Sequence, residues 1–241
     1  LEAIAWSYYG MKQYARAVDK YTELVQLYPE APEAEIALYR RGVILFNIRR
    51  GEEALASFAD QLRRFPAGAQ AANAWFQTGW IQYKALQYDK AIDAFAGYTT
   101  RFPQGDKFVD SLFWTAMARF RMRRFVEAEG VFSRIATEHA ATALAGRALV
   151  QRALCQLALK ETDKARESLQ RVIRDDRYKD VQDEALYELA KSWLDASDPD
   201  TARVFVNRLA EDFPASAWTP EAIFRLGEFY FNRAEYESAR T

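Results

Sequence analysis

Residues 71–103 read AANAWFQTGWIQYKALQYDKAIDAFAGYTTRFP and contain two amphipathic helical patterns. Leu86-Gln87-Tyr88 separates the two patterns, and Pro103 ends the second. The same pattern returns along the chain every 37 residues, and a column of alanines marks it: Ala17, Ala54, Ala91, Ala128, Ala165, Ala202 and Ala239. A period of about 20 to 50 residues with two helices per unit is typical of a solenoid, in which each repeat buries the apolar face of its neighbour.

Three further columns keep this interval. Four residues after the alanine, large apolar residues recur: Tyr21, Phe58, Phe95, Phe132, Leu169 and Val206. Twelve residues before it, small residues recur: Ala5, Gly42, Gly79, Ala116, Ala153, Ala190 and Gly227. Twelve residues after it, proline recurs at Pro29, Pro66, Pro103 and Pro214, but Ala140 and Arg177 break the column. We therefore expect less regular stacking near these two exceptions.

These columns resemble the tetratricopeptide repeat, whose pattern is W-x2-L-G-x2-Y, then A-x3-F, then P, in units of 34 residues. The matching residues of the opening stretch are Trp75, Thr78, Gly79, Ala91, Phe95 and Pro103. Near the C-terminus they are Ile223, Leu226, Gly227 and Tyr230. The resemblance covers the whole chain and implies an all-α, right-handed superhelix (solenoid) of tandem helix-turn-helix repeats.

Three extra residues per unit fall in the loop between repeats, as in FPAGAQAANAWF and FPASAWTPEAIF. This longer form resembles the repeats of bacterial periplasmic and outer-membrane-associated proteins, such as the Tol-Pal-associated coordinator of cell-wall synthesis and the outer-membrane assembly lipoproteins. The resemblance implies a place in the periplasm or on the periplasmic face of the outer membrane. A cytoplasmic location is the alternative.

We expect residues 1–241 to form a single array. Full repeats are predicted at 31–67, 68–104, 105–141, 142–178 and 179–215, with partial repeats at 1–30 and 216–241. The chain begins inside a first helix and ends at the start of a second helix near Glu235, so we expect a segment of a longer array. Gly51, between two predicted helices, suits a turn with positive φ.

The composition and the apolar runs argue against nucleic-acid binding and membrane insertion. Lys plus Arg number 33 against 34 for Asp plus Glu, so no overall field favours nucleic acid. Apolar runs are shorter than the ~18 residues that a membrane span needs, so we expect no membrane insertion. The oligomeric state is left open.

We expect neither enzymatic activity nor a metal or cofactor site. His139 is the single histidine and has no accompanying ligands or nucleophile. Cys155 shares a helix column with Ile44 and Ile81, so it is interpreted as a small core residue. The pairs Asp175-Asp176 and Glu184/Glu188 are interpreted as solvated carboxylates.

The candidate binding residues lie on the first helix of each repeat. One aromatic column is interpreted as core packing: Tyr39, Phe76, Phe113, Tyr187 and Phe224. A different stripe then faces the concave groove, and its positions follow helical spacing. Its apolar position holds Trp6, Val43, Trp80, Met117 and Leu154, followed by the charged Lys191 and Glu228. Its polar and basic edge includes Arg40, Gln77, Asn47, Lys84 and Arg121, and Trp114 interrupts the polar series.

An apolar patch with a polar rim suits a protein or peptide partner. The sequence therefore predicts a non-catalytic scaffold that binds a partner segment in this groove, with Trp80, Trp114 and Met117 as anchors and Lys84 and Arg121 as polar partners. The alternative is a glycan-binding element of a cell-wall or polysaccharide export system, which would need exposed, coplanar tryptophan faces flanked by Asn, Asp or Gln.

Overall fold

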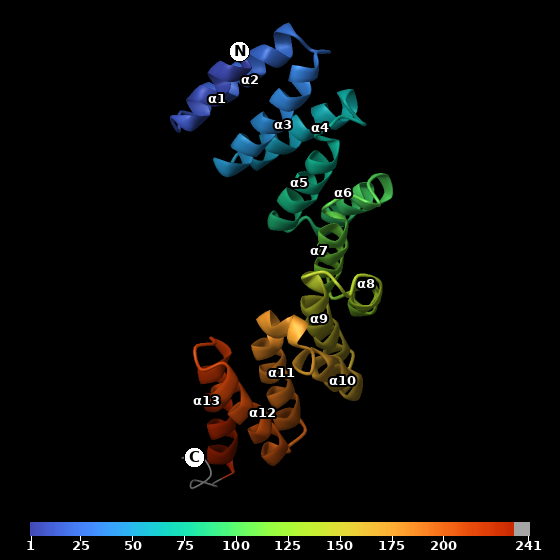
Figure 1. The fold of residues 1–241 in the computed structure, drawn as a ribbon, viewed down its shortest axis with the longest axis vertical. Coiled ribbons are helices and arrows are strands. Elements are labelled where there is room, and N and C mark those ends of the chain that lie inside the picture. The colour runs from blue at the N-terminus through green and yellow to red at the C-terminus, as the bar shows by residue number, and fades with distance from the viewer. Residues whose placement is uncertain (234–241) are drawn as a thin grey trace. The chain divides into compact units, whose positions relative to one another are not determined.

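The computed structural model describes residues 1–233, and these form helices without any strand. The expected Ala239 column member and the expected helix start at Glu235 lie outside the described residues. Contacts divide the chain into two compact units, Leu1–Met122 and Arg123–Thr241, with the division at the turn inside predicted repeat 105–141. The helices follow one another in chain order (Figure 1).

The helices of the first unit are α1 (Glu2–Gly10), α2 (Tyr14–Leu27), α3 (Pro32–Asn47), α4 (Gly51–Arg64), α5 (Ala71–Lys84), α6 (Tyr88–Arg101) and α7 (Phe108–Arg121). Each packs against the next, and the alternate helices α3, α5 and α7 also touch in sequence. The second unit contains α8 (Phe125–Glu138), α9 (Leu144–Ala158), α10 (Thr162–Ile173), the 3-10 helix η1 (Asp176–Val181), α11 (Gln182–Asp195), α12 (Pro199–Asp212) and α13 (Trp218–Asn232). The expected class, an all-α tandem array of helix-turn-helix units, is confirmed.

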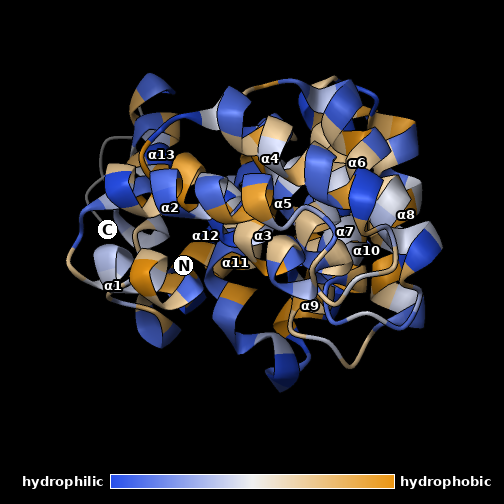
Figure 2. Ribbon diagram, turned by 90° about the horizontal axis from the view of Figure 1, so that it is seen from above, coloured by the Kyte–Doolittle hydropathy of each residue, from blue (hydrophilic) through white to orange (hydrophobic). Residues whose placement is uncertain are grey.

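The helices are amphipathic, and hydrophilic and hydrophobic residues alternate around them (Figure 2). Within a pair, the small column of the first helix packs against the aromatic column of the second. A Cβ atom added at Gly79 would lie 2.7 Å from the Phe95 ring, and one at Gly42 would lie 2.7 Å from the Phe58 ring. At Gly42 and Gly79 the paired helices therefore approach too closely for a side chain in the first helix.

The turn within each pair also repeats every 37 residues. The residues with positive φ are Lys12, Arg49, Leu86, Arg123, Lys160 and Ser197. At the second of these turns, the Arg50 N–H donates to the Leu45 carbonyl at 2.8 Å and the Arg49 N–H to the Phe46 carbonyl at 2.9 Å. This is a Schellman motif, which satisfies the last carbonyls of the first helix.

The expectation of positive φ at Gly51 was wrong. No described glycine has positive φ, and Gly51 is the first residue of α4. The left-handed residue of a Schellman motif follows the C-cap residue, which is Ile48 for α3, and that position is Arg49.

Loops between repeats are held by side chains of the preceding repeat. The buried Glu35 carboxylate accepts hydrogen bonds from the backbone N–H groups of Ala69 at 3.2 Å and Gln70 at 2.6 Å. One repeat later, the hydroxyl of Tyr98 accepts from the Lys107 N–H at 2.9 Å. Glu35 and Tyr98 thus each supply an acceptor for backbone N–H groups of the next loop, because buried backbone donors must have hydrogen-bond partners.

In the second unit, η1 lies where Arg177 replaces the loop proline. The Asp175 side chain accepts from the Arg177 N–H at 3.1 Å and caps η1. Tyr178 and Val181 are buried, and the Tyr178 ring packs so closely on α9 that a Cβ at Gly146 would lie 2.8 Å from it. The irregularity expected at this loop is therefore an inserted 3-10 turn. Within residues 1–233, no helix is both long and apolar enough to cross a membrane.

Candidate functional site

The first unit has a groove of about 310 Å³ between its alternate helices α3, α5 and α7. The lining residues are Val43, Phe46, Asn47, Phe76, Gln77, Trp80 and Trp114. Five of these were predicted for the binding surface: Val43, Asn47, Gln77, Trp80 and Trp114. We call this surface the aromatic groove. Two pairs of equivalent residues meet here, Val43 with Trp80 and Gln77 with Trp114, because α3, α5 and α7 are successive first helices.

Three aromatic rings, those of Trp80, Tyr83 and Trp114, cluster at the edge of this surface. The ring centres of Trp80 and Trp114 are 4.7 Å apart, with an angle of 66° between the planes. The Tyr83 ring stacks on Trp80 at 6.1 Å and 8°, and meets Trp114 edge-on at 5.0 Å. Edge-to-face and offset pairs are the favoured geometries of aromatic rings. All three side chains are half-buried, so the cluster is held in place and still presents ring surface to solvent.

Two exposed cations border the ring cluster. The Lys84 ammonium lies 5.6 Å from the centre of the Trp80 ring, within the range of a cation–π contact. Interaction with the Tyr83 hydroxyl raises the pKa of Arg121 above its usual value. Both residues occupy the same repeat position, 37 residues apart.

Four of the predicted residues are outside the groove lining: Lys84 and Arg121, which border the ring cluster, and Arg40 and Met117. The Arg40 guanidinium pairs with Glu2 at 2.8 Å and lies over the Trp6 ring, 4.6 Å from its centre. Arg40 therefore belongs to a separate contact between α1 and α3. Met117 is half-buried on α7, outside the lining set.

Sequence reasoning did not place Phe46 or Phe76 in the groove or Tyr83 beside it: it interpreted the column of Phe76 as core packing and gave Phe46 and Tyr83 no binding role. Phe76 does pack on Phe95, with ring centres 5.7 Å apart, yet it also lines the groove. The signal for Tyr83 was its position three residues after Trp80, which places the two rings on one helix face.

The core interpretation of the Tyr39 column holds only in part. Phe113 and Tyr187 are buried, and Tyr39 and Phe76 are half-buried. Phe224 is 64% exposed, contrary to expectation, because α13 packs only on α11 and α12 among the described helices.

The structure shows the environments of the residues for which no catalytic or metal-binding role was expected. Cys155 is fully buried, and burial raises its thiol pKa to about 12, so the reactive thiolate is suppressed. His139 is the C-cap residue of α8, and its backbone N–H donates to the Ile135 carbonyl at 3.0 Å. The expectation that Glu188 is solvated was wrong: it is 7% exposed and pairs with Lys191 at 3.1 Å on the buried side of α11. Among the described residues, no cluster of potential metal ligands occurs.

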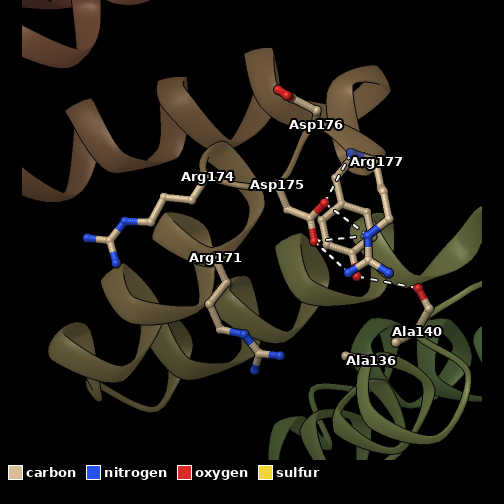
Figure 3. A pocket seen from close by; sticks show the side chains of 8 residues that line it. Ala136, Ala140, Arg171, Arg174, Asp175, Asp176 and Arg177 are labelled. Atoms are coloured by element: carbon tan, nitrogen blue, oxygen red, sulfur yellow. Dashed lines mark hydrogen bonds and ion pairs between the residues drawn. The ribbon is translucent and has the colours of Figure 1, made fainter.

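A wider hollow of about 610 Å³ lies beside η1 in the second unit (Figure 3). Arg171, Arg174 and Arg177 border it together with Asp175 and Asp176. The Asp175 carboxylate already holds the Arg177 fork, with a closest contact of 2.6 Å. Two carboxylates and the C-terminus of α10 offset the three cations there, so this hollow is a poorer anion site than its arginines suggest.

Comparison with known proteins agrees with this architecture. Family models of the tetratricopeptide repeat match residues 2–69, and residues 73–105, 147–176 and 184–216. The chain belongs to the tetratricopeptide-repeat family. The models leave residues 106–146 of this repeat protein unmatched. This segment nevertheless contains the helix pair α7 and α8, and Arg123 between them has the positive φ that recurs in the turns of the other pairs.

Several solved structures share the fold at low sequence identity. The C-terminal part of a repeat-containing protein from Cytophaga hutchinsonii has a TM-score of 0.74 at 17% identity, covering 99% of this chain and 91% of that one. YrrB, described as a tetratricopeptide-repeat protein with an unusual peptide-binding site, has a TM-score of 0.60 at 16% identity, covering 84% and 96%. PilW, a type IV pilus biogenesis factor, has a TM-score of 0.61 at 16% identity, covering 92% and 96%. No curated protein matches the chain.

Proposed function

We propose that this repeat protein is a non-catalytic scaffold that binds a segment of a partner protein in the aromatic groove. The observation that carries the proposal is the ring cluster of Trp80, Tyr83 and Trp114, which is half-exposed at the edge of a groove about 310 Å³ in volume. Tryptophan is over-represented among the residues that dominate binding energy, and the helices beneath hold these rings in place before a partner arrives.

The geometry favours a protein segment over a glycan. Stacking on sugar rings would require the two tryptophan faces to be coplanar, but their planes are inclined by 66°. Phe46, Phe76 and Val43 extend the apolar surface, which suits an apolar side chain better than a hydroxylated one.

We further propose that this protein acts in assembly or maintenance of the bacterial cell envelope, in the periplasm or on the periplasmic face of the outer membrane. The support is the loop form described above and the likeness of fold to PilW, a pilus biogenesis factor. Fractionation of cells that express the full-length protein tests this part, and recovery with cytoplasmic markers alone would contradict it.

Selection of random displayed peptides on the immobilised protein tests the binding proposal. A selected peptide is labelled, and its Kd is measured by fluorescence anisotropy. We expect Trp80→Ala to weaken binding about 30-fold or more, which corresponds to about 2 kcal/mol.

Trp75→Ala is the matched control. Trp75 lies on the same helix but packs against α6, where Arg101 is 4.7 Å from its ring centre. We expect this control to lower the melting temperature and leave Kd unchanged. Failure to enrich any peptide, or equal Kd values for wild type and Trp80→Ala, would contradict the proposal.

A further inference from the structure

The cations at the aromatic groove differ from the many basic residues of this protein that pair with a carboxylate. Elsewhere, exposed arginines and lysines commonly pair with a carboxylate three or four residues away, as Arg50 does with Glu53 and Arg134 with Glu138. Within residues 1–233, neither Lys84 nor Arg121 pairs with a carboxylate, and both instead face the rings of Trp80 and Tyr83. Two positive charges at one repeat position are thus left without a negative partner.

The groove itself supplies no negative charge. Its lining is made of apolar, aromatic and amide side chains. The carboxylate of Glu2 is already paired with Arg40, on α1 and α3. An anionic group at the rim would therefore meet two cations and no opposing carboxylate from the lining. Its attraction would be stronger than on an open surface, because the rings exclude part of the water.

We infer that the partner segment carries an acidic side chain next to its large apolar anchor. The inference rests on the proposed function and specifies the chemistry of the occupant. The anchor side chain packs on Trp80 and Trp114, and the neighbouring Asp or Glu accepts hydrogen bonds from Lys84 and Arg121. Hydrogen bonds between ionised partners are shorter and stronger than neutral ones, and the arginine fork can hold a carboxylate in two bonds.

Peptide selection on three forms of the protein tests this chemistry. The forms are wild type, the double variant Lys84→Glu with Arg121→Glu, and a control with the same charge change, Arg63→Glu with Lys90→Glu. Arg63 and Lys90 are exposed on the second helices α4 and α6, outside the groove lining. We expect wild type and control to enrich peptides with Asp or Glu beside a large apolar residue, and the groove variant to enrich Lys or Arg there.

Binding constants then separate charge from fold. A wild-type-selected peptide is compared with its Glu→Gln or Asp→Asn form, and both are made with an amidated C-terminus so that only the internal side chain is probed. We expect the neutral peptide to bind wild type about ten-fold more weakly. The same peptide pair should differ little on Lys84→Gln with Arg121→Gln, a variant that keeps the side chains long and polar. Added salt should weaken only the acidic peptide on wild type.

The outcomes distinguish the two proposals. Peptides that require Trp80 but show no acidic preference would overturn this inference and leave the scaffold function standing. Failure to enrich peptides would overturn both. Tight binding of labelled oligothymidylate that depends on Lys84 and Arg121 would also overturn the inference, by showing that the cations serve a nucleic acid backbone.

Discussion

Ala91→Leu tests whether the 37-residue alanine column marks the contact between paired helices. Ala91 is fully buried on α6, one turn before Phe95, whose ring already fills the space above Gly79 of α5. Leucine adds three carbons at a position that is completely buried. Because leucine and alanine have similar helix propensities, the change isolates packing. Overpacking of this kind costs about 1–3 kcal/mol.

For a chain of this size, each kcal/mol lowers the melting temperature by about 2–4 °C, so we expect a decrease of about 2–12 °C. Thermal unfolding followed by circular dichroism measures it. Ala96→Leu is the matched control, since Ala96 is exposed on the same helix. Hydrogen exchange should also accelerate mainly in α5, α6 and α7, because repeats interact with their nearest neighbours. Equal melting temperatures for the two variants would refute the assignment of this column to a helix contact.

Three further measurements probe other buried groups. Glu35→Ala should destabilise the protein by about 2–4 kcal/mol in denaturant titration, because it leaves two loop N–H donors without their acceptor. The control Glu30→Ala changes an exposed residue and should alter the free energy of unfolding little. Similar losses of stability in the two variants would argue against the role of Glu35 in holding the loop. Cys155 should resist alkylation at neutral pH until the protein unfolds, because burial removes access and raises its thiol pKa to about 12; rapid labelling of the folded protein would contradict this. Burial and the nearby Glu188 carboxylate raise the pKa of Glu184, so its ionisation on α11 weakens the fold as pH rises above the ordinary range for glutamate. Glu184→Gln should therefore raise the melting temperature at neutral pH and leave it nearly unchanged in acid, and an equal effect at both pH values would show that charge is not the cause.

The repeat architecture could be predicted because it depends on local periodicity. The 37-residue interval between Ala54, Ala91 and Ala128 identified the units, and helical spacing placed Trp80, Lys84 and Gln77 on one face of one helix. The small residues in the column of Gly79 and the large apolar residues in the column of Phe95 kept the same interval. Such patterns need no knowledge of distant contacts, since every repeat meets a similar neighbour.

Whether an individual side chain is buried or exposed depended on tertiary contacts. Glu188 lies in a polar column and is buried beside Lys191, whereas Phe224 lies in an aromatic column and is exposed. Whether a side chain is buried depends on which residues of the next helix pack against it. The repeat position of a residue in the sequence does not give this information. The same limit applies to Arg40, which pairs with Glu2 from α1 and not with the groove.

The sequence by itself determined that α5 and α7 would present Trp80 and Trp114 on the same face of the array, at neighbouring positions of the stripe, because both positions follow from helical spacing and the repeat period. Only the tertiary structure decided that the two rings meet at 66°, that Tyr83 joins them, and that Phe46 and Phe76 line the same groove. The physical reason is that ring angles and exposure depend on how close the first helices of successive repeats lie. That distance is set by side chains about 37 residues apart, packed together across three repeats.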